Sequence, residues 1–210
     1  MKTFRQLHLY GSRAEIAAIH AKLAEFVPTA AWSLNETLRG SSAPDVTVFE
    51  YTGADAPGAF VWLFDEPCGA RVTNIVPKSA GSLSYDEYNT IATRFAEEVL
   101  APLATPPVEI RLGPAEKTID DFLPAAAASA LRRFSTSANR STGSAHPQDA
   151  EKWDTFVILA YRARVSMGPD TLQRLLVEDE HWDHEQALEL AIQYERALRL
   201  LESNDNFKAA

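Results

Sequence analysis

The chain has little cysteine and no long apolar stretch. Its single cysteine, Cys68, cannot form an internal disulfide, and a cysteine-based metal site needs several such residues. No run approaches the roughly 18 apolar residues that a membrane-spanning helix requires, and residues 1–10 lack the apolar core of a signal peptide. The sequence therefore predicts a cytoplasmic protein that is not attached to a membrane.

Basic residues are outnumbered by acidic ones. The 20 Lys and Arg residues face 29 Asp and Glu residues, which gives a formal net charge of -9. Nucleic acids and anionic membranes attract basic surfaces, so we expect neither as a partner. A local basic groove is still compatible with this composition. The clearest basic cluster is Arg132, Arg133 and Arg140, although arginines near a helix end also complement the helix dipole without any ligand.

Several catalytic signatures are missing from the sequence. It has no P-loop, no Gly-x-Gly-x-x-Gly turn after a strand and no Gly-x-Ser-x-Gly elbow. Cys68 lies in a predicted turn and could act as a nucleophile, but no base partner for it can be identified. We therefore expect a binding role rather than an enzymatic one, and no cofactor.

The pattern of the chain changes near Gly113 and Pro114. The 210 residues are enough for one large domain or two small ones, and 46% hydrophobic with 23% charged residues is typical of a globular protein. Strand-like and helical segments alternate before this point, and only helical segments follow it. We predict an α+β domain over residues 1–113 and a helical domain over residues 114–210, and leave open whether they are one domain or two.

Residues 1–113 predict an antiparallel sheet. Capping boxes at Ser12–Glu15 and Ser84–Glu87 begin two helices, because Ser and Glu three residues apart can satisfy each other's backbone groups. The resulting order favours a sheet with both helices on one face, a ferredoxin-like plan with extra strands. The expected strands cover residues 7–9, 46–51, 60–64, 71–76 and 108–112, with residues 31–35 as a further edge strand.

Two parts of this region could also contact a partner. The unbroken apolar run Phe60–Phe64 indicates a strand that is buried on both faces or a face that a partner covers. The loop Ser79–Ser84 leads into a helix start that contains Tyr85, Tyr88 and Asn89, which could touch a ligand. Ordinary capping also explains that helix start.

Residues 114–210 predict a helical bundle. Helix starts are indicated at Thr118, Pro124, Pro147, Asp170 and Asp183, where capping residues or a first-turn proline precede apolar residues at helical spacing. The polar residues 202–210 are expected to form a fraying tail.

The loop before the helix that starts at Pro147 gathers site-type residues. Hydroxyl and amide side chains there can satisfy backbone donors, Gly143 permits a left-handed turn, and His146 can cap the helix. This structural interpretation explains each residue type but not their concentration, so a binding role is kept open. The candidate ligand or partner residues are Asn139, Arg140, Ser141, Thr142, Ser144, His146, Asp149 and Trp153.

Arg140 and His146 are separated by five residues, a spacing that resembles the Arg-x(4 to 6)-His motif of HEPN ribonucleases, which are small helical nucleases of bacterial defence and toxin systems. The resemblance implies that both residues act at an RNA phosphate, often at a dimer interface. A polar residue commonly follows the arginine in that family, as Ser141 does here. The present motif, however, precedes most of the predicted bundle instead of lying near its end.

The longer run from Ala138 to Pro147 resembles a loop in uncharacterised bacterial proteins, with the pattern Ala-Asn-x-Ser-Thr-Gly-Ser-x-His-Pro before a helix that contains Trp and Phe. This resemblance extends loosely over the helical half and implies no particular activity.

The segment Glu178–Glu185 is rich in oxygen and nitrogen ligands. His181 and His184 are weak candidates for metal binding, because they do not form the His-Glu-x-x-His zinc signature. Solvated charge around a helix start explains the same residues.

The sequence thus favours a protein that works by binding another macromolecule, with a protein as the expected partner. The most specific version of this hypothesis is an immunity or antitoxin-like protein that neutralises a toxic enzyme by covering a basic surface of that enzyme. The alternative is a HEPN-like ribonuclease, or another defence-system component, that uses Arg140 and His146. A component that senses a small ligand in an inter-domain cleft is a third possibility.

Overall fold

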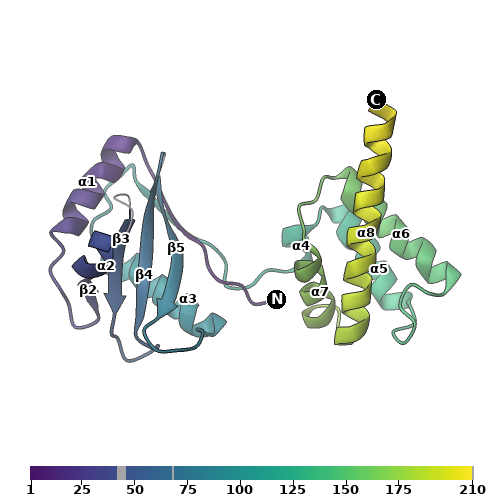
Figure 1. Ribbon diagram of the computed structural model, residues 1–210, viewed down its shortest axis with the longest axis horizontal. Coiled ribbons are helices and arrows are strands. Elements are labelled where there is room, and N and C mark those ends of the chain that lie inside the picture. The colour runs from purple at the N-terminus through teal and green to yellow at the C-terminus, as the bar shows by residue number, and fades with distance from the viewer. Residues whose placement is uncertain (42–45, 68, 210) are drawn as a thin grey trace. The chain divides into compact units, whose positions relative to one another are not determined.

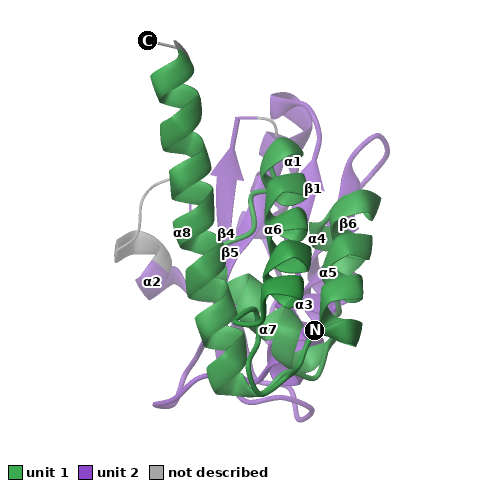
Figure 2. Ribbon diagram, turned by 90° about the vertical axis from the view of Figure 1, so that its right-hand side faces the viewer, with its two compact units in different colours: residues 1, 116–210 green, residues 2–115 purple. Residues whose placement is uncertain are grey.

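A computed structural model describes residues 1–41, 46–67 and 69–209 (Figure 1). The chain divides into two compact units, one formed by residues 2–115 and the other by Met1 with residues 116–210 (Figure 2). This division lies close to the change of pattern at Gly113 and Pro114. Cys68, for which the sequence raised a catalytic hypothesis, lies outside the described residues.

The unit of residues 2–115 is built on a six-stranded antiparallel sheet, which confirms the α+β prediction. The strand order is β2-β3-β4-β5-β1-β6. Without β2, the short helix α2 and β3, the elements follow the β-α-β-β-α-β order of the ferredoxin-like plan. The strands are β1 (Leu7–Tyr10), β2 (Trp32–Leu34), β3 (Val46–Tyr51), β4 (Ala59–Glu66), β5 (Gly69–Pro77) and β6 (Glu109–Leu112).

The helices of this unit are α1 (Arg13–Ala24), α2 (Glu36–Ser41) and α3 (Tyr85–Arg94), and α3 continues into a π-helical segment, η1 (Phe95–Leu100). Both expected capping boxes are present, with Ser12 and Ser84 as the N-caps. Side chains of α1, α3 and η1 share one buried core with the sheet, so the two main helices cover the same face. The sequence did not predict α2, and it predicted the helix from Ser84 to continue through Phe95 and Val99 without indicating the π-helical form of η1.

The run Phe60–Phe64 has two different sides. Val61 and Leu63 are fully buried in the core, whereas Phe60, Trp62 and Phe64 on the opposite side of β4 are only partly buried. Because side chains alternate along a strand, one side meets the helices and the other forms the second face of the sheet.

The second unit is helical. It contains α4 (Ile119–Phe122), α5 (Ala125–Ser137), α6 (Pro147–Arg162), α7 (Pro169–Glu178) and α8 (His184–Ala209). Their apolar faces form a single core. Among the described residues, no helix combines the length and the apolar character needed to cross a membrane.

The expected fraying tail is wrong for most of its length, because α8 continues to Ala209. Figure 1 shows its last turns extending past the neighbouring helices of the unit. Asp205 accepts a hydrogen bond from the Tyr161 hydroxyl of α6 at 2.7 Å, and Ser203 donates to the carbonyl of Arg199 within the helix. These contacts stabilise polar residues that the sequence pattern alone assigns to a tail.

Candidate functional site

The loop of residues 139–146 is a turn that satisfies much of its own polar character. The carbonyl of Asn139 accepts hydrogen bonds from the N–H groups of Thr142 and Gly143, at 3.1 and 2.9 Å. Its side-chain oxygen accepts from both the N–H and the hydroxyl of Ser141. Gly143 has a φ of 56°, the left-handed conformation that glycine adopts readily.

Asp149 and Ser144 fix this loop to two helices. Asp149, 7% exposed in the first turn of α6, accepts the N–H of Asn139 at 3.3 Å and pairs with Lys152 at 3.2 Å. Burial by itself would raise the pKa of Asp149, but the hydrogen bond from Asn139 and the Lys152 ammonium bring it below its usual value. The Ser144 hydroxyl is hydrogen-bonded to Gln193 of α8.

Arg140 and His146 have different surroundings. The Arg140 guanidinium donates to the carbonyl of Glu180 at 2.7 Å and lies over the Trp182 ring, 5.2 Å from its centroid. His146 caps α6 and lines a cavity of about 630 Å³ to which Arg140 does not contribute. In the described part of the chain, the Arg140 and His146 side chains share neither a hydrogen bond nor a cavity.

Trp153 and the two candidate metal-binding histidines also have local explanations. Trp153 is 3% exposed and packs between Phe134 and Phe156 in the core of the bundle. His184 lies 3.4 Å from the side chain of Gln173. Within the described ranges, no three His, Cys, Asp or Glu side chains come together as a metal site would require, so His181 and His184 have no visible ligand set.

A polar network accompanies η1 in the first unit. The Tyr51 hydroxyl donates to Asp55 at 2.7 Å, Arg94 pairs with Asp55 and Glu98, and Glu98 accepts the indole N–H of Trp32 at 2.8 Å. Burial, and then the Asp55 carboxylate, raise the pKa of Tyr51 to about 12. Each of these polar groups has a partner within the network, which links β2, β3 and α3 and is explained by the fold.

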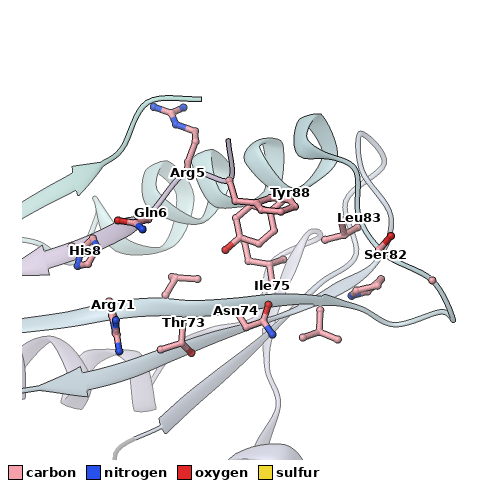
Figure 3. A pocket seen from close by; sticks show the side chains of 15 residues that line it. Arg5, Gln6, His8, Arg71, Thr73, Asn74, Ile75, Ser82, Leu83 and Tyr88 are labelled. Atoms are coloured by element: carbon pink, nitrogen blue, oxygen red, sulfur yellow. The ribbon is translucent and has the colours of Figure 1, made fainter. Parts of the chain in front are cut away.

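A groove of about 610 Å³ lies on the same unit and is the strongest candidate site (Figure 3). One wall is β5, with Arg71, Thr73 and Asn74, and the other wall is the segment that leads into β1. Figure 3 shows Tyr88, Ile75 and Leu83 between these walls. The lining residues are Phe4, Arg5, Gln6, His8, Arg71, Val72, Thr73, Asn74, Ile75, Val76, Pro77, Gly81, Ser82, Leu83 and Tyr88.

The groove exists because β1 and β5 separate. Their pairing runs from Tyr10 opposite Gly69 to His8 opposite Arg71 and stops there. On its other side, β5 pairs with β4 as far as Pro77. Within the described residues, Val72–Pro77 therefore has a strand partner on one side only, and its other edge borders the groove.

The opposite wall is already hydrogen-bonded. The side chain of Asn89 in α3 accepts the N–H of Arg5 at 2.8 Å and donates to the carbonyl of Thr3 at 2.9 Å, as a neighbouring strand would. The carbonyl of Gln6 accepts the N–H of Gly113 at 2.8 Å. Of the two walls, β5 thus presents the longer run of main-chain groups open to a ligand.

The structure also explains the residues of α3 that the sequence singled out. Tyr88 and part of the Ser79–Ser84 loop line the groove, whereas Asn89 holds the wall from behind. Phe4 covers Tyr85 and Tyr88, with ring centroids 4.4 and 4.7 Å away. The sequence indicated these side chains but could not show the strand edge opposite them.

The groove is locally basic in an acidic chain. Arg5, His8 and Arg71 are among its lining residues, although the Arg5 guanidinium donates to the Gly113 carbonyl at 2.7 Å and to the Thr93 hydroxyl at 2.9 Å. None of the lining residues is Asp or Glu. Arg71 pairs with Glu66 at 2.7 Å, yet its side chain is still 49% exposed.

Comparison with known proteins assigns no function to the groove or to the loop of residues 139–146. No protein-family model matches the chain, and the comparisons with curated proteins and with solved structures found no match either. Function is therefore inferred from the geometry of the groove and of the loop.

Proposed function

We propose that the protein works by binding another protein, and that the groove beside β5 is the contact site. The observation that supports this most directly is the one-sided pairing of Val72–Pro77 next to an apolar floor. A strand edge with unpaired N–H and C=O groups binds extended segments through main-chain hydrogen bonds, while neighbouring pockets select their side chains.

The groove is a better candidate than the loop of residues 139–146 and the start of α6. In the loop, Asn139, Ser144 and Asp149 are engaged in hydrogen bonds that hold their own unit together. A partner that bound these groups would have to replace existing hydrogen bonds. Such an exchange adds little binding free energy, because each new bond is formed at the expense of an old one. At the edge of β5, a partner would satisfy groups that lack a protein partner in the described chain.

The narrower form of the proposal is an immunity or antitoxin-like protein that neutralises a toxic enzyme by direct binding. Its support is the net charge of -9, which complements a basic enzyme surface and accelerates association through long-range attraction. The cytoplasmic setting inferred from the single cysteine is part of this proposal.

A photo-crosslinking amino acid placed at Ser82 tests the proposal in cells. Ser82 is exposed and lines the groove, whereas Asp154 is exposed on α6 and serves as the control position. We expect one protein to be cross-linked from position 82 and not from position 154, and to bind the full chain again when both are purified. Equal cross-linking from both positions, or a protein that fails to bind when purified, would contradict the proposal.

The immunity form has its own test. If the cross-linked protein is a toxic enzyme, its expression alone should arrest growth, and co-expression of the full chain should restore growth. A partner that is harmless when expressed alone would exclude this form and leave the binding function in place.

A further inference from the structure

We infer that the groove takes an extended acidic segment of the partner protein, which adds as a strand along Val72–Pro77 of β5. This inference rests on the proposed function and specifies the chemistry of the partner. Three features of the groove favour such a segment, which are its free strand edge, the bonds already made on its opposite wall and its local charge.

The free edge has the length of an ordinary strand. Six residues at about 3.3 Å each give roughly 20 Å of strand. About every second residue directs its N–H and C=O toward the groove, which allows several main-chain hydrogen bonds to an added strand. Pro77 has no N–H and marks the end of this edge. A small ligand would satisfy only a fraction of these groups, so an extended peptide fits the edge better.

The bonds already made on the opposite wall determine how an added strand would lie. Asn89 and Gly113 already bind main-chain groups of Thr3, Arg5 and Gln6 on the opposite wall, so the added strand would pair mainly with β5. Its side chains would alternate between the apolar floor, formed by Ile75, Leu83 and Tyr88, and the outer side of the sheet. The expected segment therefore has apolar residues at every second position.

The charge of the groove determines which residues are favoured at the positions between the apolar ones. Arg71 supplies the exposed positive charge of the lining, because the Arg5 guanidinium is already bound to the Gly113 carbonyl and the Thr93 hydroxyl. Glutamate or aspartate is therefore favoured beside Arg71, and lysine is repelled. Arg71 is paired with Glu66, but a guanidinium has five N–H donors and can bind a second carboxylate. The ion pairs Lys78–Glu50 and Lys2–Asp86 do not add to this charge, because none of their residues lines the groove.

A labelled peptide of alternating valine and glutamate, as long as the free edge, is the probe for this inference. Its binding to the full chain would be measured by fluorescence anisotropy, and the amide protection of residues 72–76 by hydrogen exchange. Three further probes separate the contributions. They are the same peptide with lysine in place of glutamate, the same peptide N-methylated at alternate residues, and a single-stranded oligouridylate.

We expect the valine–glutamate peptide to bind and to protect the amides of residues 72–76, since Pro77 has no N–H. N-methylation should weaken binding about tenfold or more, because it removes main-chain hydrogen bonds. Arg71→Gln should weaken it by about threefold to tenfold. Arg111→Gln is the matched control, because Arg71 and Arg111 both lie opposite His8 in neighbouring strands but only Arg71 lines the groove.

Several results would overturn the inference. Absence of binding, or binding without protection of residues 72–76, would exclude an added strand, as would an undiminished affinity of the N-methylated peptide. Equal binding of the lysine peptide would exclude charge selection, and displacement by oligouridylate would indicate a nucleic-acid site instead. If a protein is cross-linked specifically from Ser82 while the peptides fail, the proposed function stands and this inference falls.

Discussion

The loop of residues 139–146, with the start of α6, and the groove beside β5 differ in what their polar groups do. The loop has many conspicuous polar residues, but these hold a turn and join α6 to α8. The groove has few conspicuous residues, but it borders a strand edge that has no partner in the described chain. The comparison teaches that binding capacity depends on unsatisfied groups more than on the number of polar residues in a segment. Substitutions in the loop should therefore affect stability, and substitutions in the groove should affect binding.

The largest effect is expected from Trp153→Ala. Trp153 is 3% exposed and packs against Phe134 and Phe156, so its truncation should destabilise the helical unit by about 3–5 kcal/mol. Urea unfolding followed by circular dichroism measures this effect, and Trp153→Phe should be milder. A fully stable Trp153→Ala variant that loses partner binding would identify Trp153 as a contact residue and would reverse the comparison.

The next effect concerns the groove. Ser82→Trp places a large side chain at the rim and should weaken binding of the cross-linked partner by about tenfold or more, because the added ring competes for the groove. The unfolding midpoint should not change, since Ser82 is exposed. Isothermal titration and thermal unfolding of the same preparation measure both quantities. A variant with normal affinity would place the contact elsewhere.

A smaller effect is expected from Asp149→Asn, which should lower the melting temperature of the helical unit by a few degrees at pH 7. The pKa of Asp149 lies below its ordinary value of 3.8 in the folded protein, so its ionised form stabilises the fold above that pH. This contribution is lost as the pH falls through the folded-state pKa. The difference between the variant and the parent protein should therefore shrink on acidification.

Thermal scans at pH 7 and at pH values near and below 4 measure this convergence. Asp154→Asn is the control, because Asp154 is exposed on the same helix. A difference that persists unchanged at low pH would show that the charge of Asp149 is not what holds the loop.

The smallest effects are expected from Arg140→Ala and His146→Ala. Arg140 would lose its bond to Glu180 and its contact with Trp182, and His146 would lose a long capping bond to Gln148, so each should cost about 1 kcal/mol or less. Neither should alter partner binding. Incubation with RNA provides the decisive comparison, because robust cleavage by the parent protein that disappears in both variants would establish the ribonuclease alternative.

Local chemistry explains which parts of the fold were predictable. The boxes at Ser12 and Ser84 involve residues three positions apart, and both helices begin where these residues place them. The change of pattern near Gly113 also separates the sheet from the helices. By contrast, the last turns of α8 contact residues far away in the chain, as in the bond between Tyr161 and Asp205.

The candidate site was predictable only in part. The sequence singled out Tyr88 and the Ser79–Ser84 loop, and the structure places both at the groove. It also drew attention to Asn139, Arg140 and His146, whose contacts are now visible but whose function is still a prediction. Arg140 illustrates the difficulty, because the carbonyl that it binds belongs to Glu180, forty residues later in the chain.

The sequence by itself determined most of the elements, because capping, turn chemistry and apolar periodicity act over a few neighbouring residues. Only the tertiary structure decided where β1 separates from β5, since that depends on pairing between His8 and Arg71, which lie far apart in the chain. The same separation leaves the edge of Val72–Pro77 open. Main-chain groups are identical in every residue apart from proline, so no side-chain pattern can reveal which of them lack a partner.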